Sequence, residues 1–126
     1  MGAASFEVAT RGFRGDTDTN TGQVATAVAG TQVARIAPAA LQVGRFVVDV
    51  TVGYGAVAGP ADDMELRRGG VAIATLHVLP AVNTTMPVQR FQCVELVGSD
   101  DLSVNVIVGG IAGAVYRATI LATLFR

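Results

Sequence analysis

The chain has 126 residues, of which 51% are hydrophobic and only 15% are charged. This length is typical of one domain with a single core. The formal net charge is −1, so no strong field favours nucleic acid or an anionic membrane, and we expect neither as a partner. No apolar run approaches the roughly 18 residues that a membrane-spanning helix needs. The first residues show no basic segment followed by an apolar run, so we expect no signal peptide.

The hydrophobic fraction is high for a monomer of this size, because a small domain needs a charged surface to remain unassociated. Small Ala, Val and Gly side chains supply much of this content, and they suit close packing between subunits. All nine basic residues are arginine; interfaces favour arginine over lysine, but we attribute the absence of lysine to biased genome composition and base the interface on the small apolar residues. We therefore expect part of the apolar surface to lie in a subunit interface.

The first 22 residues are the least core-like part of the chain. From Thr10 to Gly22 the sequence is polar and rich in turn formers, with no sustained period. We expect residues 1–22 to form an extended arm or surface loop that becomes ordered against a partner. The side chains expected to anchor this arm are Phe6, Arg11, Phe13 and Arg14.

Residues 23–36 alternate loosely around Gly30, which fits a strand pair or a bulged strand, with a helix as the alternative because of the Ala content. The next run, residues 45–52, alternates clearly. Phe46, Val48, Val50 and Val52 share one face, while Val47, Asp49 and Thr51 share the other, more polar face. This pattern predicts a half-buried strand.

The clearest hairpin spans residues 64–78. Gly69 and Gly70 stand between two alternating runs and supply the positive φ that a tight turn requires. Residues 88–97 predict a further strand with Val88, Val94 and Leu96 in phase, and residues 102–108 predict another.

The final run, from Val115 to Phe125, is apolar or small on both faces. We expect one face to meet the core and the other to meet a neighbouring subunit. The predicted subunit-interface residues are Val115, Arg117, Thr119, Leu121, Thr123 and Phe125. Seven or eight short strands without a long amphipathic helix predict an all-β, antiparallel jelly-roll sandwich over residues 23–126.

No group of side chains forms a catalytic or metal-binding pattern. His77 has no acid or thiol at metal-ligand spacing, and Cys93 alone cannot form an intramolecular disulfide. The pairs Asp62–Asp63 and Asp100–Asp101 flank turns, where Asp is favoured for backbone reasons. We therefore predict a protein that is not an enzyme and that has no metal or other cofactor.

Three features recur in one known family: the strand at 45–52, the hairpin Met64-Glu-Leu-Arg-Arg-Gly-Gly-Val-Ala72, and the segment from Leu96 to Val106. From Gly44 onward the chain resembles the C1q/TNF-like jelly roll. It departs from the family in its closing strand, where Tyr116 to Phe125 replace a Phe-x-Gly-Phe segment, and it has no collagen-like stalk. The resemblance implies a compact homotrimer packed around a three-fold axis.

Trimers of this kind also form decoration, fibre-head and tail modules of bacteriophage particles. The resemblance therefore implies a homotrimeric decoration (cement) protein that is made in the host cytoplasm and binds the capsid surface of a virion. Its expected partners are itself and the major capsid protein or another virion component. The alternative is a ligand- or receptor-binding head module of a tail fibre or adhesin. The chain has only seven aromatic residues and no Trp, and this weakens the version of the alternative in which the ligand is a carbohydrate.

Overall fold

The computed structural model describes residues 17–25, 29–36, 44–82, 88–97, 100–107 and 114–124. Its strands are β2 (Thr17–Ala25), β3 (Gln32–Ile36), β4 (Gly44–Tyr54), β5 (Asp62–Arg68), β6 (Val71–Val78), β7 (Gln89–Leu96), β8 (Leu102–Val106) and β9 (Val115–Leu124). Within these ranges we find no helix, and hence none that is long and apolar enough to cross a membrane.

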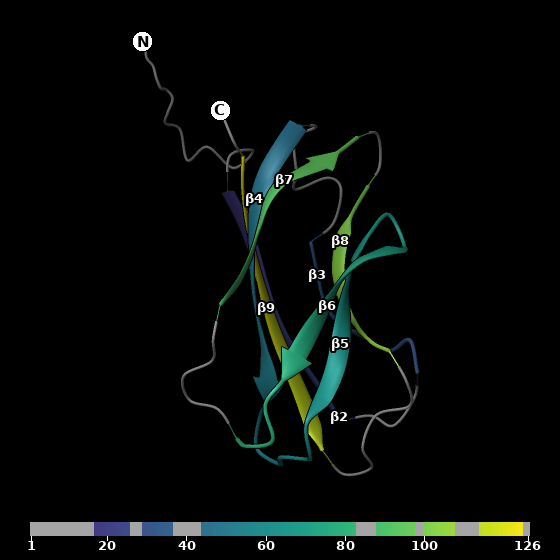
Figure 1. The fold of residues 1–126 in the computed structure, drawn as a ribbon, viewed down its shortest axis with the longest axis vertical. Coiled ribbons are helices and arrows are strands. Elements are labelled where there is room, and N and C mark those ends of the chain that lie inside the picture. The colour runs from purple at the N-terminus through teal and green to yellow at the C-terminus, as the bar shows by residue number, and fades with distance from the viewer. Residues whose placement is uncertain are drawn as a thin grey trace.

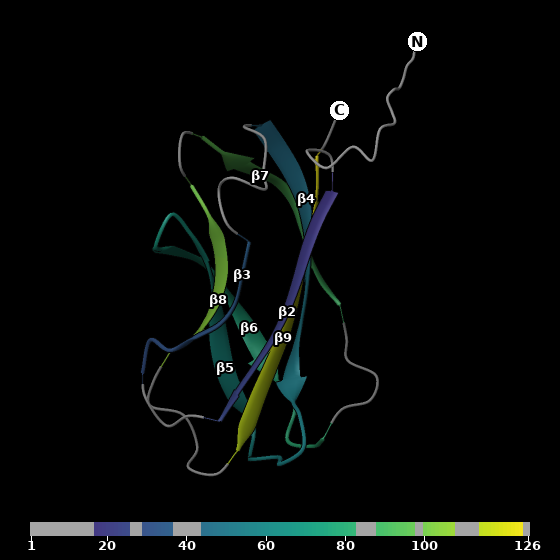
Figure 2. The same ribbon diagram turned by 180° about the vertical axis from the view of Figure 1, so that it is seen from behind.

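The described strands form two four-stranded antiparallel sheets that face each other (Figures 1 and 2). The first, called the β9 sheet here, has the order β2-β9-β4-β7. The second, called the β8 sheet, has the order β3-β8-β5-β6. This strand order is the eight-stranded jelly roll, in which Greek-key connections repeatedly cross between the two sheets. The predicted fold class, an all-β antiparallel sandwich, is confirmed.

The core lies between the sheets and is built from alternate residues of each central strand. On β4, Phe46, Val48, Val50 and Val52 are at most 2% exposed, as the alternation predicts. Side chains of the opposite β8 sheet face them, those of β9 lie beside them in the same sheet, and fully burying each large apolar side chain contributes about 1.5–3 kcal/mol. The largest fully buried residues are Tyr54, Tyr116, Phe46, Met64, Leu66, Leu76, Leu102 and Ile120.

The β5–β6 hairpin has the predicted turn. Gly69 and Gly70 have φ angles of 57° and 82°, so both occupy the left-handed region that a two-residue type I′ turn requires. β5 pairs with β8 on one side and β6 on the other, which fixes the hairpin into the β8 sheet.

The N-terminal boundary of the sandwich differs from the prediction. Residues 17–22 were expected in the arm, but they belong to β2, which pairs with β9 along its whole length. β2 lacks an apolar pattern because it is an edge strand whose inner side approaches the backbone of β3. A Cβ added at Gly22 would lie 1.7 Å from the carbonyl oxygen of Val33. Residues 1–16 lie outside the described part of the chain.

Residues 23–36 contribute to two strands that do not pair with each other. β2 and β3 are the edge strands of different sheets, so this segment crosses from one layer to the other. The prediction of two strands in this segment is therefore right, but the prediction that they pair with each other is wrong. In a jelly roll a crossover between the sheets takes the place of the hairpin.

The phase of β7 also differs from the prediction. Phe46 lies opposite Val94 while Val48 lies opposite Phe91, so β7 has one residue more than β4 between these pairs. Such a bulge reverses which residues face inward. Phe91 therefore packs against the core and Arg90 faces outward, whereas strict alternation placed Arg90 on the apolar face.

Candidate functional site

The candidate site is the outward surface of the β9 sheet, called the β9 face here. It lies on the side of the sheet that does not meet the β8 sheet (Figure 2). Its described members are Thr19, Thr21, Gln23 and Ala25 of β2; Val115, Arg117, Thr119, Leu121 and Thr123 of β9; Arg45, Val47, Asp49, Thr51 and Gly53 of β4; and Arg90 and Glu95 of β7.

Five of the six residues predicted for the subunit interface lie on this face. They alternate along β9 with Tyr116, Ala118, Ile120 and Ala122, which are at most 1% exposed and belong to the core. β9 has a neighbour on both sides, so its outward residues occupy the interior of the face and not its rim. Phe125 and the predicted arm residues Phe6, Arg11, Phe13 and Arg14 lie outside the described residues.

Short hydroxyl side chains form the middle of the β9 face. Thr21, Thr119 and Thr51 lie side by side across β2, β9 and β4, and the Thr21 and Thr119 hydroxyls are hydrogen-bonded at 2.9 Å. The Thr19 hydroxyl donates to the carbonyl of Ile120 at 2.9 Å. Side chains this short leave little relief, so another flat protein surface can approach the face closely.

A bidentate ion pair occupies the β7 side of the face. Arg90 Nε and Nη2 donate to the two carboxylate oxygens of Asp49 at 2.7 and 2.9 Å. The hydrogen bond from Arg90 holds the pKa of Asp49 below its usual value, although partial burial opposes this shift. Sequence reasoning missed the pair, because it depends on the bulge that turns Arg90 outward.

The outward side of the β8 sheet is different, because its charges are paired within the chain. Arg35 pairs with Asp101 at 2.7 Å, and Arg67 pairs with Glu65. These side chains flank Ser103 and Asn105 of β8, which are each 5% exposed, and the Ser103 hydroxyl donates to the Asn105 amide oxygen. This surface is thus electrostatically satisfied without another molecule.

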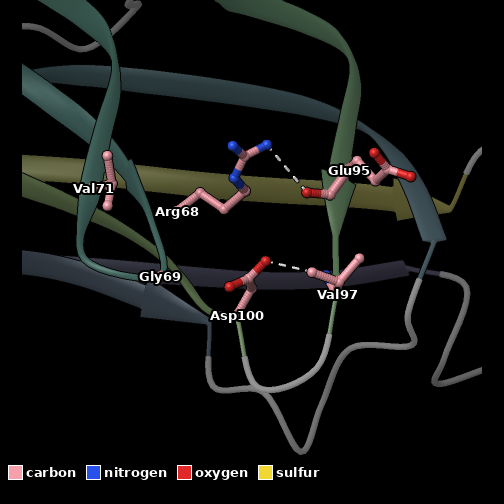
Figure 3. Close-up of a pocket in the computed structure, with 6 residues that line it drawn as sticks. All are labelled: Arg68, Gly69, Val71, Glu95, Val97 and Asp100. Atoms are coloured by element: carbon pink, nitrogen blue, oxygen red, sulfur yellow. Dashed lines mark hydrogen bonds between the residues drawn. The ribbon is translucent and has the colours of Figure 1, made fainter.

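A cavity of about 340 Å³ lies between the β5–β6 turn and the end of β7 (Figure 3). It is lined by Arg68, Gly69, Val71, Glu95, Val97 and Asp100. Arg68 Nη1 donates to the Glu95 carbonyl at 3.3 Å, and the Val97 amide donates to Asp100 Oδ2 at 3.1 Å. Among the described residues that line the cavity, none is a nucleophile placed beside a base.

His77, Asp62 and Asp63 have contacts within the chain, and the Cys93 side chain lies outside the described part. The hairpin register places Asp63 opposite His77, and Asp63 Oδ1 lies 2.8 Å from His77 Nδ1, a contact that the sequence separation concealed. Asp62 accepts a hydrogen bond from the Tyr116 hydroxyl. In the part of the chain that is described, no group of three or more His, Cys, Asp or Glu side chains is arranged to hold a metal ion.

Comparison with known proteins gives no family for this chain. No protein-family model and no curated protein matches it. One similar solved structure is a carbohydrate-binding module, CBM36 in complex with calcium and xylotriose, at 13% identity and a TM-score of 0.49. The similarity covers 80% of this chain and 85% of that chain. A likeness of this degree identifies neither a ligand nor a site here.

Proposed function

We propose that this protein is a non-enzymatic assembly protein, a homotrimeric jelly roll that decorates the capsid surface of a bacteriophage. The observation that carries the proposal is the position of Val115, Arg117, Thr119, Leu121 and Thr123. All five lie on one low-relief face and alternate with core residues on a strand in the interior of its sheet.

The β9 face is better suited to contact with another subunit than to exposure to water. Leu121 follows Thr119 on the outward side of β9, and Val47 lies opposite Thr123 on β4. Both apolar side chains are half-buried without belonging to the core. Burial of such apolar area drives association, at about 25 cal/mol per Å². The low charged fraction of the chain points the same way, since most charged residue types are depleted in interface centres.

Attachment to the particle is the second part of the proposal. A trimer carries three copies of the N-terminal segment, so weak single contacts combine into strong attachment. Phe6, Arg11, Phe13 and Arg14 supply aromatic and guanidinium groups, which are common interface anchors, and the proposed partner is the major capsid protein. The C1q/TNF-like resemblance and the jelly-roll strand order support this assignment.

Light scattering of the full chain tests the trimer. Thr119→Arg places a second large positive side chain beside Arg117 in the middle of the β9 face and is expected to convert trimer to monomer. Thr75→Arg is the matched control, because Thr75 is an exposed β6 residue on the outward side of the other sheet. A monomeric wild type, or equal behaviour of the two variants, would refute the β9 face as the interface.

Attachment is tested separately with the double variant Phe13→Ala, Arg14→Ala. It is expected to remain a trimer and to lose co-sedimentation with capsids that lack the wild-type protein. Retention of capsid binding at wild-type level would contradict the role of the arm.

A second candidate is a ligand- or receptor-binding head module, which the cavity at the β5–β6 turn favours. Val71 and Val97, which line it, are 65% and 56% exposed, and exposed apolar side chains beside a cavity are typical of recognition sites. Val97→Asp would abolish binding to host cells under this candidate and leave capsid binding unchanged under the first.

A further inference from the structure

The charged side chains of the described residues are almost all satisfied within the chain. Apart from Arg45, Glu95 and Arg117, each charged side chain that the structure describes has a hydrogen bond or an ion pair. All three exceptions lie on the β9 face. Unmatched charge is thus concentrated on the surface proposed as the subunit interface.

Arg117 differs from the other two. Arg45 and Glu95 are directly opposite each other on β4 and β7, so a change of side-chain rotamer pairs them. Arg117 lies between Gln23 of β2 and Gly53 of β4. Among the described positions that surround it on the face there is no acid; they are Ala25, Thr21, Val115, Thr119, Gly55 and Thr51.

The acids further away on the same face do not supply a partner for Arg117. Asp49 is four residues from Gly53 along β4, or about 13 Å, and already holds Arg90 through two hydrogen bonds. Glu95 lies opposite Arg45, eight residues from Gly53 along β4, or about 27 Å. Arg117 is thus a half-buried residue in a neutral, hydroxyl-rich neighbourhood.

We propose that the trimer axis holds a tetrahedral oxyanion, such as phosphate or sulfate, bound by the Arg117 side chains of three copies. This inference rests on the proposed trimer. In a trimer whose three-fold axis passes Arg117, the three identical guanidinium groups lie together, and burying like charges without a counter-ion strongly opposes assembly. Three oxygens of a tetrahedral oxyanion match three guanidinium groups around an axis, and each contact is charge-assisted.

The test compares the full-length wild type with Arg117→Gln in low-millimolar phosphate, sulfate or chloride at equal ionic strength. Phosphate and sulfate are expected to raise the melting temperature of the wild-type trimer by at least about 2 °C over chloride. They are also expected to lower about tenfold the protein concentration at which half of the trimer dissociates. Arg117→Gln is expected to lose both effects. Arg45→Gln is the matched control, because it removes the same charge from the same face and should keep the oxyanion response.

Each outcome is decisive. A trimer that responds equally to oxyanions with and without Arg117 would show only the general salting effect of these ions and would overturn the site. A trimer whose stability is the same in all three salts would also overturn it and leave the proposed function intact. A monomeric wild type would overturn the trimer and the site together.

Discussion

At Gly22, β2 approaches the backbone of β3 in the opposite sheet so closely that a side chain does not fit. A Cβ there would lie 1.7 Å from the Val33 carbonyl oxygen and 2.9 Å from its carbon, and real Cβ contacts are essentially never below 3.0 Å. Gly22→Ala thus requires the two strands to separate by at least 1.3 Å (3.0 − 1.7) at this point. The obstructing atoms are backbone, so no rotamer change relieves the clash.

The loss of stability in Gly22→Ala follows from the contacts that this separation breaks. The Arg35 amide donates to Asn20 Oδ1 at 3.1 Å across the same gap, and a shift of this size takes the two atoms out of hydrogen-bond range. Losing that bond costs about 1 kcal/mol, overpacking costs about 1–3 kcal/mol, and the lower chain entropy of Ala recovers up to about 1 kcal/mol. We expect Gly22→Ala to lower the free energy of unfolding by about 2 kcal/mol.

Urea denaturation at one fixed protein concentration measures this loss, followed by far-UV circular dichroism and tyrosine fluorescence. The chain has no Trp, and both of its tyrosines, Tyr54 and Tyr116, are fully buried, so their emission reports unfolding. Gly55→Ala is the matched control, because its added Cβ would meet the flexible end of the Gln23 side chain at 2.6 Å. Equal losses in the two variants, or a Gly22→Ala protein as stable as the wild type, would refute the reasoning.

Two further predictions concern polar contacts. Arg90 lowers the pKa of Asp49 in the folded state. The pair therefore contributes its full stabilisation above the unfolded-state pKa of about 3.9. This stabilisation is lost as the pH falls through the lower folded-state pKa. The stability difference between wild type and Asp49→Asn, from urea titrations at a series of pH values, should be constant near neutrality and shrink in acid; a difference that grows in acid would contradict the assignment. Tyr116→Phe removes the hydroxyl that donates to Asp62 and should cost about 1–2 kcal/mol in the same assay, whereas a cost below about 0.3 kcal/mol would show that water replaces this contact.

Local sequence patterns determined much of the sandwich. Strict alternation from Phe46 to Val52 specifies one buried face, because successive side chains of a strand point to opposite sides. Gly69–Gly70 specifies a hairpin, because only residues that tolerate positive φ close such a turn. These signals depend on residues adjacent in the chain, so they are readable without knowledge of the fold.

Other features were decided only by tertiary structure. β2 carries no apolar pattern, because one side faces solvent and the other approaches the backbone of β3, so its limits depend on a strand from the opposite sheet. The outward direction of Arg90 depends on a bulge that becomes visible only against the register of β4. In both places the deciding contact joins segments that are distant in sequence.

Part of the candidate site was predictable from the sequence, and part was decided only by the tertiary structure. The alternation of Val115, Arg117, Thr119, Leu121 and Thr123 with core residues follows from strand periodicity, and the sequence predicted it. The isolation of Arg117 did not follow, because it depends on which residues of β2 and β4 stand beside it. A sequence specifies the side chains along each strand, but only the pairing of strands determines which charges meet a partner.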